Sequence, residues 1–281
     1  MPDELKTTVR LQFGSSASQY ATSEIHAKGE SLGTLVALSC PQSDWTMLDV
    51  ATGAGHTAFI FGPHVARVVA TDLTEPMLQQ TTALAAAKHL RNIDVTAADA
   101  EYLPFASDVF DAMTCRLALH HFPNPGLAIA EFKRVLKPNG VLALTDNITV
   151  EDTTAAAYYN AYEKLRDPSH HRAYTLQELT DLLTTGGFIV EASRKLTKEL
   201  EFESWADRQH VSNADKHVLK DKMRHLPDTL RTLFQPRWEN DTMYFSLWEA
   251  VLVSRLESPK DQVAPRGQQS RLPLNQTPDQ V

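Results

Sequence analysis

Short hydrophobic runs alternate with amphipathic stretches through the middle of the chain, beginning at about residue 45. The runs are rich in β-branched residues, and the stretches between them have helical spacing of apolar positions. Strands that alternate with helices in this way predict a parallel β-sheet with crossover helices. The predicted strands lie at 45–50, 66–71, 92–97, 109–115 and 141–148.

Helix start and stop signals lie between these runs. Thr74 is followed by an acid and a proline, which predicts a helix to about residue 90 with the threonine hydroxyl as N-cap. A helix at 125–136 is expected to end at the turn 137–140, which contains proline and glycine. Upstream of the first run, a polar lead-in is followed by a predicted helix near 29–40.

The pattern changes after the fifth predicted strand, where helical stretches come first and two late strands follow. One of the helices begins with Thr175 and has Glu178 three residues on, which is a capping-box pattern. The two late strands suggest an extension of the sheet. The expected elements are helices at 152–166 and 175–185, a strand at 188–195, a helical insertion at 201–234 and a strand at 243–255.

Composition narrows the function classes. The chain has 27 Lys and Arg against 35 Asp and Glu, a formal charge of -8, and no long basic block. This disfavours a nucleic-acid partner and favours a small-molecule one. Cys40 and Cys115 are too few for a disulfide scaffold, which suits the cytoplasm. No leader pattern and no run of ~18 apolar residues is present, so no integral membrane association is expected.

The most informative sequence is the turn after the first predicted strand, Ala51-Thr52-Gly53-Ala54-Gly55, with a helix expected from about His56. Glycine takes backbone angles that are closed to other residues and lets a ligand approach the main chain. Free N–H groups at the start of the helix would face that ligand. The turn therefore predicts a nucleotide-like cofactor beyond the carboxyl end of the first strand.

Two acids lie at the ends of the next two predicted strands. Asp72 can accept both hydroxyls of a ribose, with Leu73 beside the base. Asp99, with Ala100, can close over an adenine and accept from its amino group. Taken singly, the glycines could belong to an ordinary βα turn, Asp72 could be a solvated helix cap and Asp99 a loop acid. Their positions at three successive strand ends favour one nucleotide site.

A dinucleotide site is an alternative, because the sequence from Gly53 to Ala58 also satisfies the G-x-G-x-x-G/A pattern, which would indicate an NAD-dependent oxidoreductase. Asp49 argues against it, because a carboxylate two residues before the turn would not favour a nearby pyrophosphate. In addition, none of the seven tyrosines begins a Tyr-x-x-x-Lys pair.

These residues, within roughly 13–150, resemble the class I S-adenosylmethionine-dependent methyltransferases, in particular the branch similar to ubiquinone/menaquinone-biosynthesis methyltransferases. The resemblance implies a Rossmann-like, doubly wound α/β sheet of seven strands, mostly parallel with an antiparallel last strand. The cofactor would be S-adenosyl-L-methionine. The matching segments are Leu48–Gly55, Ala70–Leu73, Met77-Leu78, Asp99–Phe105, Phe110-Asp111, Thr114–Arg116, His120–Phe122 and Leu136–Gly140, preceded by Phe13, Ala17, Tyr20, Ser23 and 26–29.

By this resemblance the cofactor contacts can be assigned by residue. The methionine portion would lie at Asp49 and the turn, the ribose at Asp72, and the adenine beside Leu73 with its edge at Asp99. Alanine at position 51 departs from the glycine that many family members have. The expected cofactor-binding set is Tyr20, His26, Lys28, Asp49, Ala51, Gly53, Gly55, Asp72, Leu73, Met77, Asp99, Ala100 and Arg116.

The resemblance also predicts the organisation of the chain. Residues 1–43 would form an N-terminal helical lid that includes Tyr20, His26 and Lys28. Residues 44–256 would form the methyltransferase domain, with helical insertions near 150–186 and 200–240. Residues 257–281 contain four prolines among polar residues, so a disordered tail is expected. Monomer and homodimer both remain open.

Catalysis would require little beyond positioning, because the sulfonium methyl group arrives activated. If the acceptor loses a proton, His120 or His121 could remove it, although loop packing or hydrogen bonding to backbone is the simpler explanation of both. Adjacent histidines in a strand project to opposite sides, so no shared metal ion is expected. Arg116 could pair with a carboxylate of cofactor or substrate. The acceptor is not specified; O- or C-methylation of a small molecule is the working hypothesis, and a non-catalytic cofactor-binding partner is the alternative.

Overall fold

The computed structural model describes residues 2–23, 27 and 29–257. The expected disordered tail lies outside the described residues except for Glu257, and so do His26 and Lys28 of the expected cofactor set. In the part that is described, no helix is both long and apolar enough to cross a membrane.

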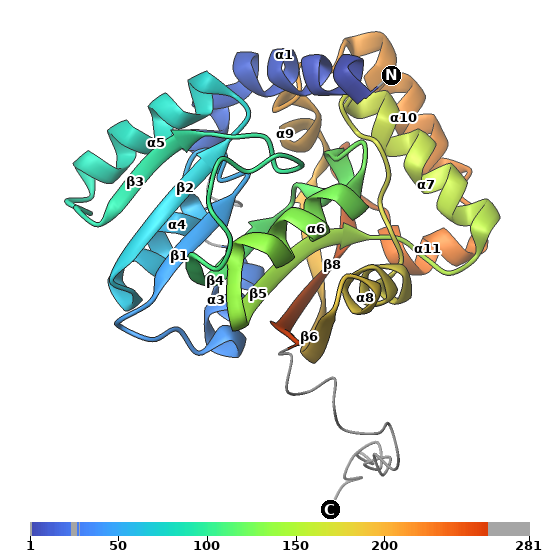
Figure 1. Ribbon diagram of the computed structural model, residues 1–281. Helices are drawn as coiled ribbons and strands as arrows, with labels where there is room; N and C mark the ends of the chain where they lie inside the picture. Colours follow the sequence, from blue (N-terminus) through green and yellow to red (C-terminus); the bar gives the residue numbers. More distant parts are fainter. Residues whose placement is uncertain (1, 24–26, 28, 258–281) are drawn as a thin grey trace, which may run out of the picture.

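A central sheet confirms the predicted α/β architecture (Figure 1). Seven strands follow the order β3-β2-β1-β4-β5-β8-β6, in which β8 is antiparallel to both neighbours and β1 to β5 are parallel. A short additional strand, β7, pairs with β8 and was not predicted. The strands are β1 (Thr46–Val50), β2 (Arg67–Asp72), β3 (Ile93–Ala97), β4 (Phe110–Arg116), β5 (Leu136–Ile148), β6 (Phe188–Glu201), β7 (Arg237–Glu239) and β8 (Thr242–Leu256).

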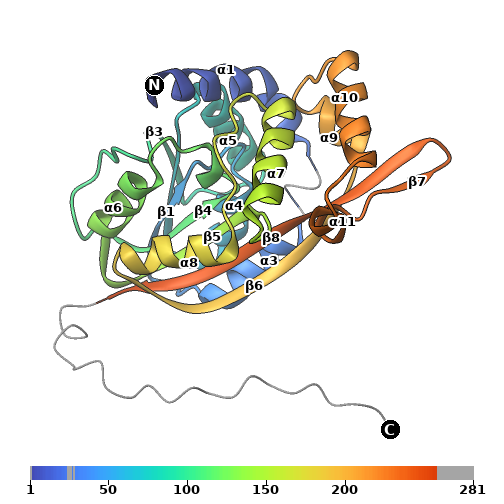
Figure 2. The same ribbon diagram turned by 90° about the vertical axis from the view of Figure 1, so that its right-hand side faces the viewer.

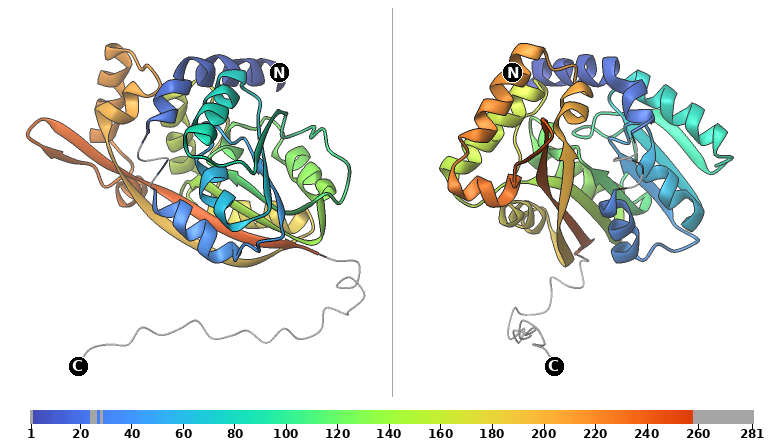
Figure 3. Two further views of the ribbon diagram at one scale, coloured as in Figure 1. Left: turned by 90° about the vertical axis from the view of Figure 1, so that its left-hand side faces the viewer. Right: turned by 180° about the vertical axis from the view of Figure 1, so that it is seen from behind.

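Helices cover both faces of the sheet, which Figure 3 shows from one side and from behind. Successive strand residues point to opposite faces, so Met47 packs with one layer and Leu48 with the other. The helices are α1 (Pro2–Ala21), α3 (Glu30–Ser39), α4 (His56–Phe61), α5 (Glu75–Ala87), α6 (Pro125–Val135), α7 (Thr153–Arg166), α8 (Leu176–Thr185), α9 (Phe202–Asp207), α10 (Asn213–Arg224) and α11 (Asp228–Phe234), with 3-10 turns η1 (Gly62–His64) and η2 (Leu119–His121).

The sheet faces are covered by different helices. Helices α6 and α8 pack on the face that includes Leu48, and α3, α4 and α5 pack on the face that includes Met47. A separate aromatic core joins α7, α9, α10 and α11 to the ends of β6 and β8, and Tyr162 and Trp205 stack there at 5.7 Å. The β7–β8 hairpin projects beyond these helices (Figure 2).

Several elements depart from the sequence expectation. Residues 1–43 were expected to be a helical lid, with a helix placed only near 29–40; in the structure residues 2–21 also form a 20-residue helix, α1, which lies over one end of the sheet (Figure 1). Strand β6 continues to Glu201 because it pairs with the long β8 along its whole length. Helix α5 begins where predicted, but the Thr74 hydroxyl does not cap it; this hydroxyl is buried and has no hydrogen-bond partner among the residues that the structure describes. The Asp72 carboxylate accepts the Thr74 N–H there. The capping box of α8 is confirmed.

The turn after β1 requires unusual backbone angles. Gly53 and Gly55 have φ of +56° and +89°, and Ala51 adopts +53° despite its side chain. A Cβ on Gly55 would lie 2.4 Å from the ring of Phe59, which is buried. A Cβ on Gly53 would meet nothing within 4 Å. The two glycines therefore have different roles. Gly55 allows Phe59 of α4 to pack against the turn, and Gly53 leaves space beside the main chain.

We predict that Gly55→Ala destabilises the protein by at least about 2 kcal/mol more than Gly53→Ala, which should cost about 1 kcal/mol for backbone strain alone. Denaturant unfolding of both variants measures the difference. Equal losses of stability would contradict the separate packing role of Gly55.

Candidate functional site

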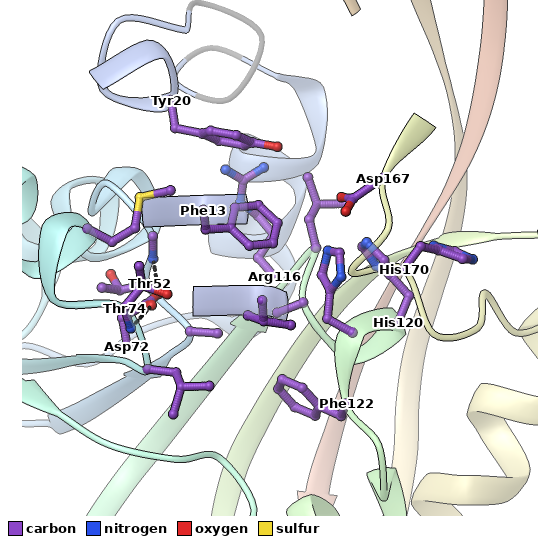
Figure 4. A pocket seen from close by; sticks show the side chains of 18 of the residues that line it. Phe13, Tyr20, Thr52, Asp72, Thr74, Arg116, His120, Phe122, Asp167 and His170 are labelled. Carbon is purple, nitrogen blue, oxygen red and sulfur yellow. Dashed lines mark hydrogen bonds between the residues drawn. The ribbon is translucent and has the colours of Figure 1, made fainter. Parts of the chain in front are cut away.

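A cavity opens at the carboxyl ends of β1, β2 and β4, and side chains of α1 form part of its wall (Figure 4). Figure 4 shows Asp72 and Thr74 on one side, His120, Asp167 and His170 on the other, and Phe13 and Tyr20 above. The space between the walls is about 1460 Å³, part of it open to solvent. Its walls come both from the strand ends and from the segments that follow α7 and β6, so the cavity extends from one to the other.

The structure brings most of the predicted site residues to this one cavity. Asp49, which precedes the turn, and Gly55, which ends it, are not among its lining residues. Of the predicted residues that the structure describes, those in the wall are Tyr20, Ala51, Gly53, Asp72, Leu73, Met77, Asp99, Ala100, Arg116, His120 and His121.

Asp49, in β1, anchors the turn to the sheet. Its carboxylate is buried and accepts hydrogen bonds from the hydroxyls of Thr52, in the turn, and Thr114, in β4, both at 2.6 Å. Burial raises the pKa of Asp49 to about 6, although these hydrogen bonds oppose the shift. This carboxylate therefore acts on the cavity through the turn that it anchors.

Asp72 connects the turn to the next helix. One carboxylate oxygen accepts the Gly53 N–H and the other accepts the Thr74 N–H, both at 2.8 Å. Burial raises the pKa of Asp72, because the charged form loses hydration. The arrangement orients a carboxylate at the wall beside the open space of Gly53, where a polar ligand group can approach it.

Lys6 of α1 contacts the acids that follow β3. Nothing in the sequence pattern predicted this contact. Its ammonium donates to Asp99 and Glu101, each at 2.7 Å. Burial opposes the charge of Lys6, but the hydrogen bonds to the two carboxylates outweigh it and the pKa of Lys6 is raised. Glu101 also accepts the Asn124 N–H at 2.6 Å. Helix α1 is thus fastened over this side of the cavity.

The two histidines lie in the 3-10 turn η2, not in a strand, and the expectation that they project to opposite sides is wrong. Their ring centroids are 4.1 Å apart, because a tight turn places neighbouring side chains together. No group of three or more potential metal ligands is found within residues 2–23, 27 and 29–257.

His120 has a charged partner that the sequence analysis missed. Its Nδ1 lies 2.5 Å from Asp146 Oδ1, and the backbone N–H of His120 donates to Asp146 Oδ2 at 2.9 Å. Burial lowers the pKa of His120, but the Asp146 carboxylate outweighs it, so the pKa is raised. The Asp146 contact fixes Nδ1–H as the donor and leaves Nε2 for a ligand. Asp146 lies near the end of β5, the strand next to β4, and this position was the sequence signal from which the partner of His120 could have been predicted.

His121 differs from its neighbour in charge. Its Nδ1 lies 3.0 Å from the carbonyl oxygen of Ser169, and burial lowers its pKa to about 4. The ring of His121 also packs edge-on against Phe13 of α1 at 5.0 Å. His121 is therefore neutral at physiological pH and serves as part of the packed wall.

Arg116, at the end of β4, is partly buried in the cavity wall and donates to the Thr57 hydroxyl at 3.0 Å. Burial lowers the pKa of Arg116, and the charges of Glu249 and Asp49 oppose that effect. Glu249 also accepts from Lys198 at 2.9 Å. Arg116 thus lies among acids of the protein, in a position that also faces the cavity.

Comparison with known proteins identifies the group to which these features belong. Residues 48–144 match a family model described as a methyltransferase domain. The chain is 31% identical over 228 residues to the uncharacterized methyltransferase YcgJ of Bacillus subtilis, covering 81% of this chain and 90% of YcgJ. It is 30% identical to the ubiquinone/menaquinone biosynthesis C-methyltransferase UbiE of Rhizobium meliloti, covering 60% of this chain and 65% of UbiE.

Solved structures show the same architecture. The crystal structure of YcgJ superimposes with a TM-score of 0.77 at 29% identity, covering 81% of this chain and 98% of YcgJ. A protein of Bacillus halodurans C-125, provisionally classed as a methyltransferase, superimposes with a TM-score of 0.78 at 35% identity, covering 82% of this chain and 100% of that one.

We predict that Asp49→Asn changes how stability depends on pH. The native state binds the Asp49 proton more tightly than the unfolded chain, whose pKa is near 3.8. Native stability from this group therefore falls as pH rises from about 4 through 6. Between pH 4.5 and 8, the wild type should lose about 2 kcal/mol relative to Asp49→Asn in denaturant unfolding. A constant difference across that range would rule out the elevated pKa.

Proposed function

The chain belongs to the class I S-adenosylmethionine-dependent methyltransferases, and we propose that it transfers a methyl group from S-adenosylmethionine to an oxygen or carbon of a small-molecule acceptor. One observation carries the proposal. A single cavity brings Asp72 and Asp99, the acids suited to a nucleoside, together with the His120–Asp146 pair, which is suited to removing a proton.

The residues present fit S-adenosylmethionine. The Asp72 carboxylate would accept the ribose hydroxyls, Leu73 and Met77 would contact the adenine, and Asp99 with Ala100 would face its edge. Ala51, Gly53 and Arg116 would lie along the methionine portion, while Asp49 would hold the turn through Thr52 and Gly55 would end it at α4. When bound, the cofactor supplies an already activated methyl group. The protein's own task is to hold the acceptor in line and exclude water.

His120 is the proposed general base. Its Nε2 would accept the proton of an acidic acceptor atom, while Asp146 holds the ring and stabilises the resulting imidazolium. His121, with its lowered pKa, would shape the wall beside it.

Helix α1 is the proposed lid over the cofactor. Lys6 fastens it to Asp99 on the nucleoside side. On the other side Gln209 accepts from Gln12 at 2.6 Å and donates to the Tyr20 hydroxyl at 2.9 Å. Because Asp99 is the group proposed to meet the adenine, the Lys6 contact would rearrange when the cofactor enters.

Membership of a methyltransferase family leaves the NAD-dependent oxidoreductase without support. Experiment distinguishes an enzyme from the remaining alternative, a non-catalytic cofactor-binding subunit. Titration with S-adenosylmethionine should show binding, and mass-spectrometric screening of small metabolites should find one that gains a single methyl group. Binding with no methylated product in any compound class would favour the non-catalytic alternative.

We predict that Asp72→Asn weakens binding of S-adenosylhomocysteine at least tenfold, because a charged acceptor for two hydroxyls is lost. The matched control is Asp94→Asn on β3, whose carboxylate is exposed and pairs with Arg67. Calorimetric titration measures both, and unchanged affinity in Asp72→Asn would remove the ribose assignment.

We predict that His120→Ala lowers kcat at least 100-fold with any acceptor found by the screen, while the cofactor affinity changes less than about threefold. Asp146→Asn should also lower kcat. In addition, it should move the acidic limb of the kcat profile to lower pH, because loss of the carboxylate lowers the pKa of His120. A profile with an unshifted acidic limb would show that Asp146 has only a structural role.

A further inference from the structure

Two arginines of the helical insertions line the same cavity, and the cofactor assignment does not use them. Arg166 ends α7 and Arg208 follows α9. Arg166 immediately precedes Asp167, which lies across the cavity from Asp72 in Figure 4. Burial, together with the positive charge of Arg166, lowers the pKa of Arg208. Two cations are thus held near each other in a partly desolvated place.

The hydrogen bonding of Arg208 is incomplete. One terminal nitrogen donates to the Ser204 hydroxyl at 3.2 Å. The Nε atom is buried and has no hydrogen-bond partner among the described residues. A buried donor left unpaired destabilises the folded state, and more so on a charged group, so this position suits a ligand that supplies an acceptor atom.

Arg166 is fixed in place by Trp205. Its Nε and a terminal nitrogen both donate to the Trp205 carbonyl oxygen, at 3.3 and 3.0 Å, and its guanidinium lies 4.7 Å from the centre of the Trp205 ring. A guanidinium that is already oriented binds an oxyanion with little further loss of side-chain freedom.

The nearby acids are engaged elsewhere. Asp167 accepts from Ser169 and Gln209, and Glu201 accepts two backbone N–H groups at the start of α9. Burial raises the pKa of Glu163, which favours its neutral form. In the described part of the chain, neither Arg166 nor Arg208 makes an ion pair with a carboxylate within 4.0 Å. An incoming anion would therefore not compete with an existing salt bridge.

We propose that the methyl acceptor carries an anionic group, a carboxylate or a phosphate, which Arg208 and Arg166 bind at the insertion side of the cavity. The body that carries it would be apolar, because Leu200, Trp205 and Leu247 also line the cavity and Trp205 lies against Arg166. This inference rests on the proposed methyl transfer and adds to it the chemical class of the acceptor.

The test uses benzoate and phenyl phosphate as anionic probes and benzamide as the neutral probe of similar shape. Binding is followed by ligand-detected NMR titration, with and without saturating S-adenosylhomocysteine. The variant is Arg208→Gln, and the matched control is Arg255→Gln, which loses the same charge from a residue of β8 that pairs with Glu191 outside the cavity wall.

We expect at least one anionic probe to bind at least tenfold more weakly to Arg208→Gln than to Arg255→Gln, with benzamide binding more weakly than benzoate to the wild type. The tighter of the two anions identifies the group as carboxylate or phosphate. Arg208→Lys, which keeps the charge but lacks the Nε donor, should lose at least threefold and carries the test if Arg208→Gln does not fold.

Equal anion affinity in the Arg208 and Arg255 variants, or benzamide binding as tightly as benzoate, would overturn the proposal. Cofactor binding is measured separately by calorimetry in the same samples. If the wild type does not bind S-adenosylhomocysteine, the proposed function is rejected. The dependence of benzoate binding on Arg208 is measured without cofactor, so it tests this inference alone.

Discussion

The buried carboxylate of Asp49 is the interaction on which the site depends. Its two oxygens tie the turn after β1 to β4 through Thr52 and Thr114. A buried carboxylate must be hydrogen-bonded to be tolerated, so these contacts fix the turn with little freedom. Asp72 then connects the turn to α5 through Gly53 and Thr74. The floor of the cavity follows from these two carboxylates.

The cavity combines a floor and a roof of different origin. The sheet supplies the turn, Asp72 and Arg116 from strand ends, where ligands of open α/β sheets bind. Helices α1, α7 and α9 supply the cover, and α7 and α9 have their own packed core around Tyr162 and Trp205. A rigid floor suits a cofactor, and a separately packed cover can be adapted to an acceptor. This division explains why the proposed acceptor contacts come from insertions.

Sequence patterns predicted the sheet well because they reflect local burial. The five parallel strands, the start of α5 and the capping box of α8 depend on nearby residues and were predicted from them. Strand β7 and the length of β6 depend on long-range pairing with β8, and the placement of α1 over the cavity depends on long-range contacts such as that of Lys6 with Asp99. Lys6 and Asp146 were missed for the same reason, because their partners are 93 and 26 residues away.

A crystal structure with S-adenosylhomocysteine bound tests the account most directly. We predict the ribose hydroxyls within hydrogen-bond distance of Asp72, the adenine amino group at Asp99 in place of Lys6, and the sulfur facing the side of the cavity that holds His120. S-adenosylhomocysteine bound elsewhere, or bound here with its sulfur turned away from His120, would contradict the division of the cavity into a cofactor side and an acceptor side.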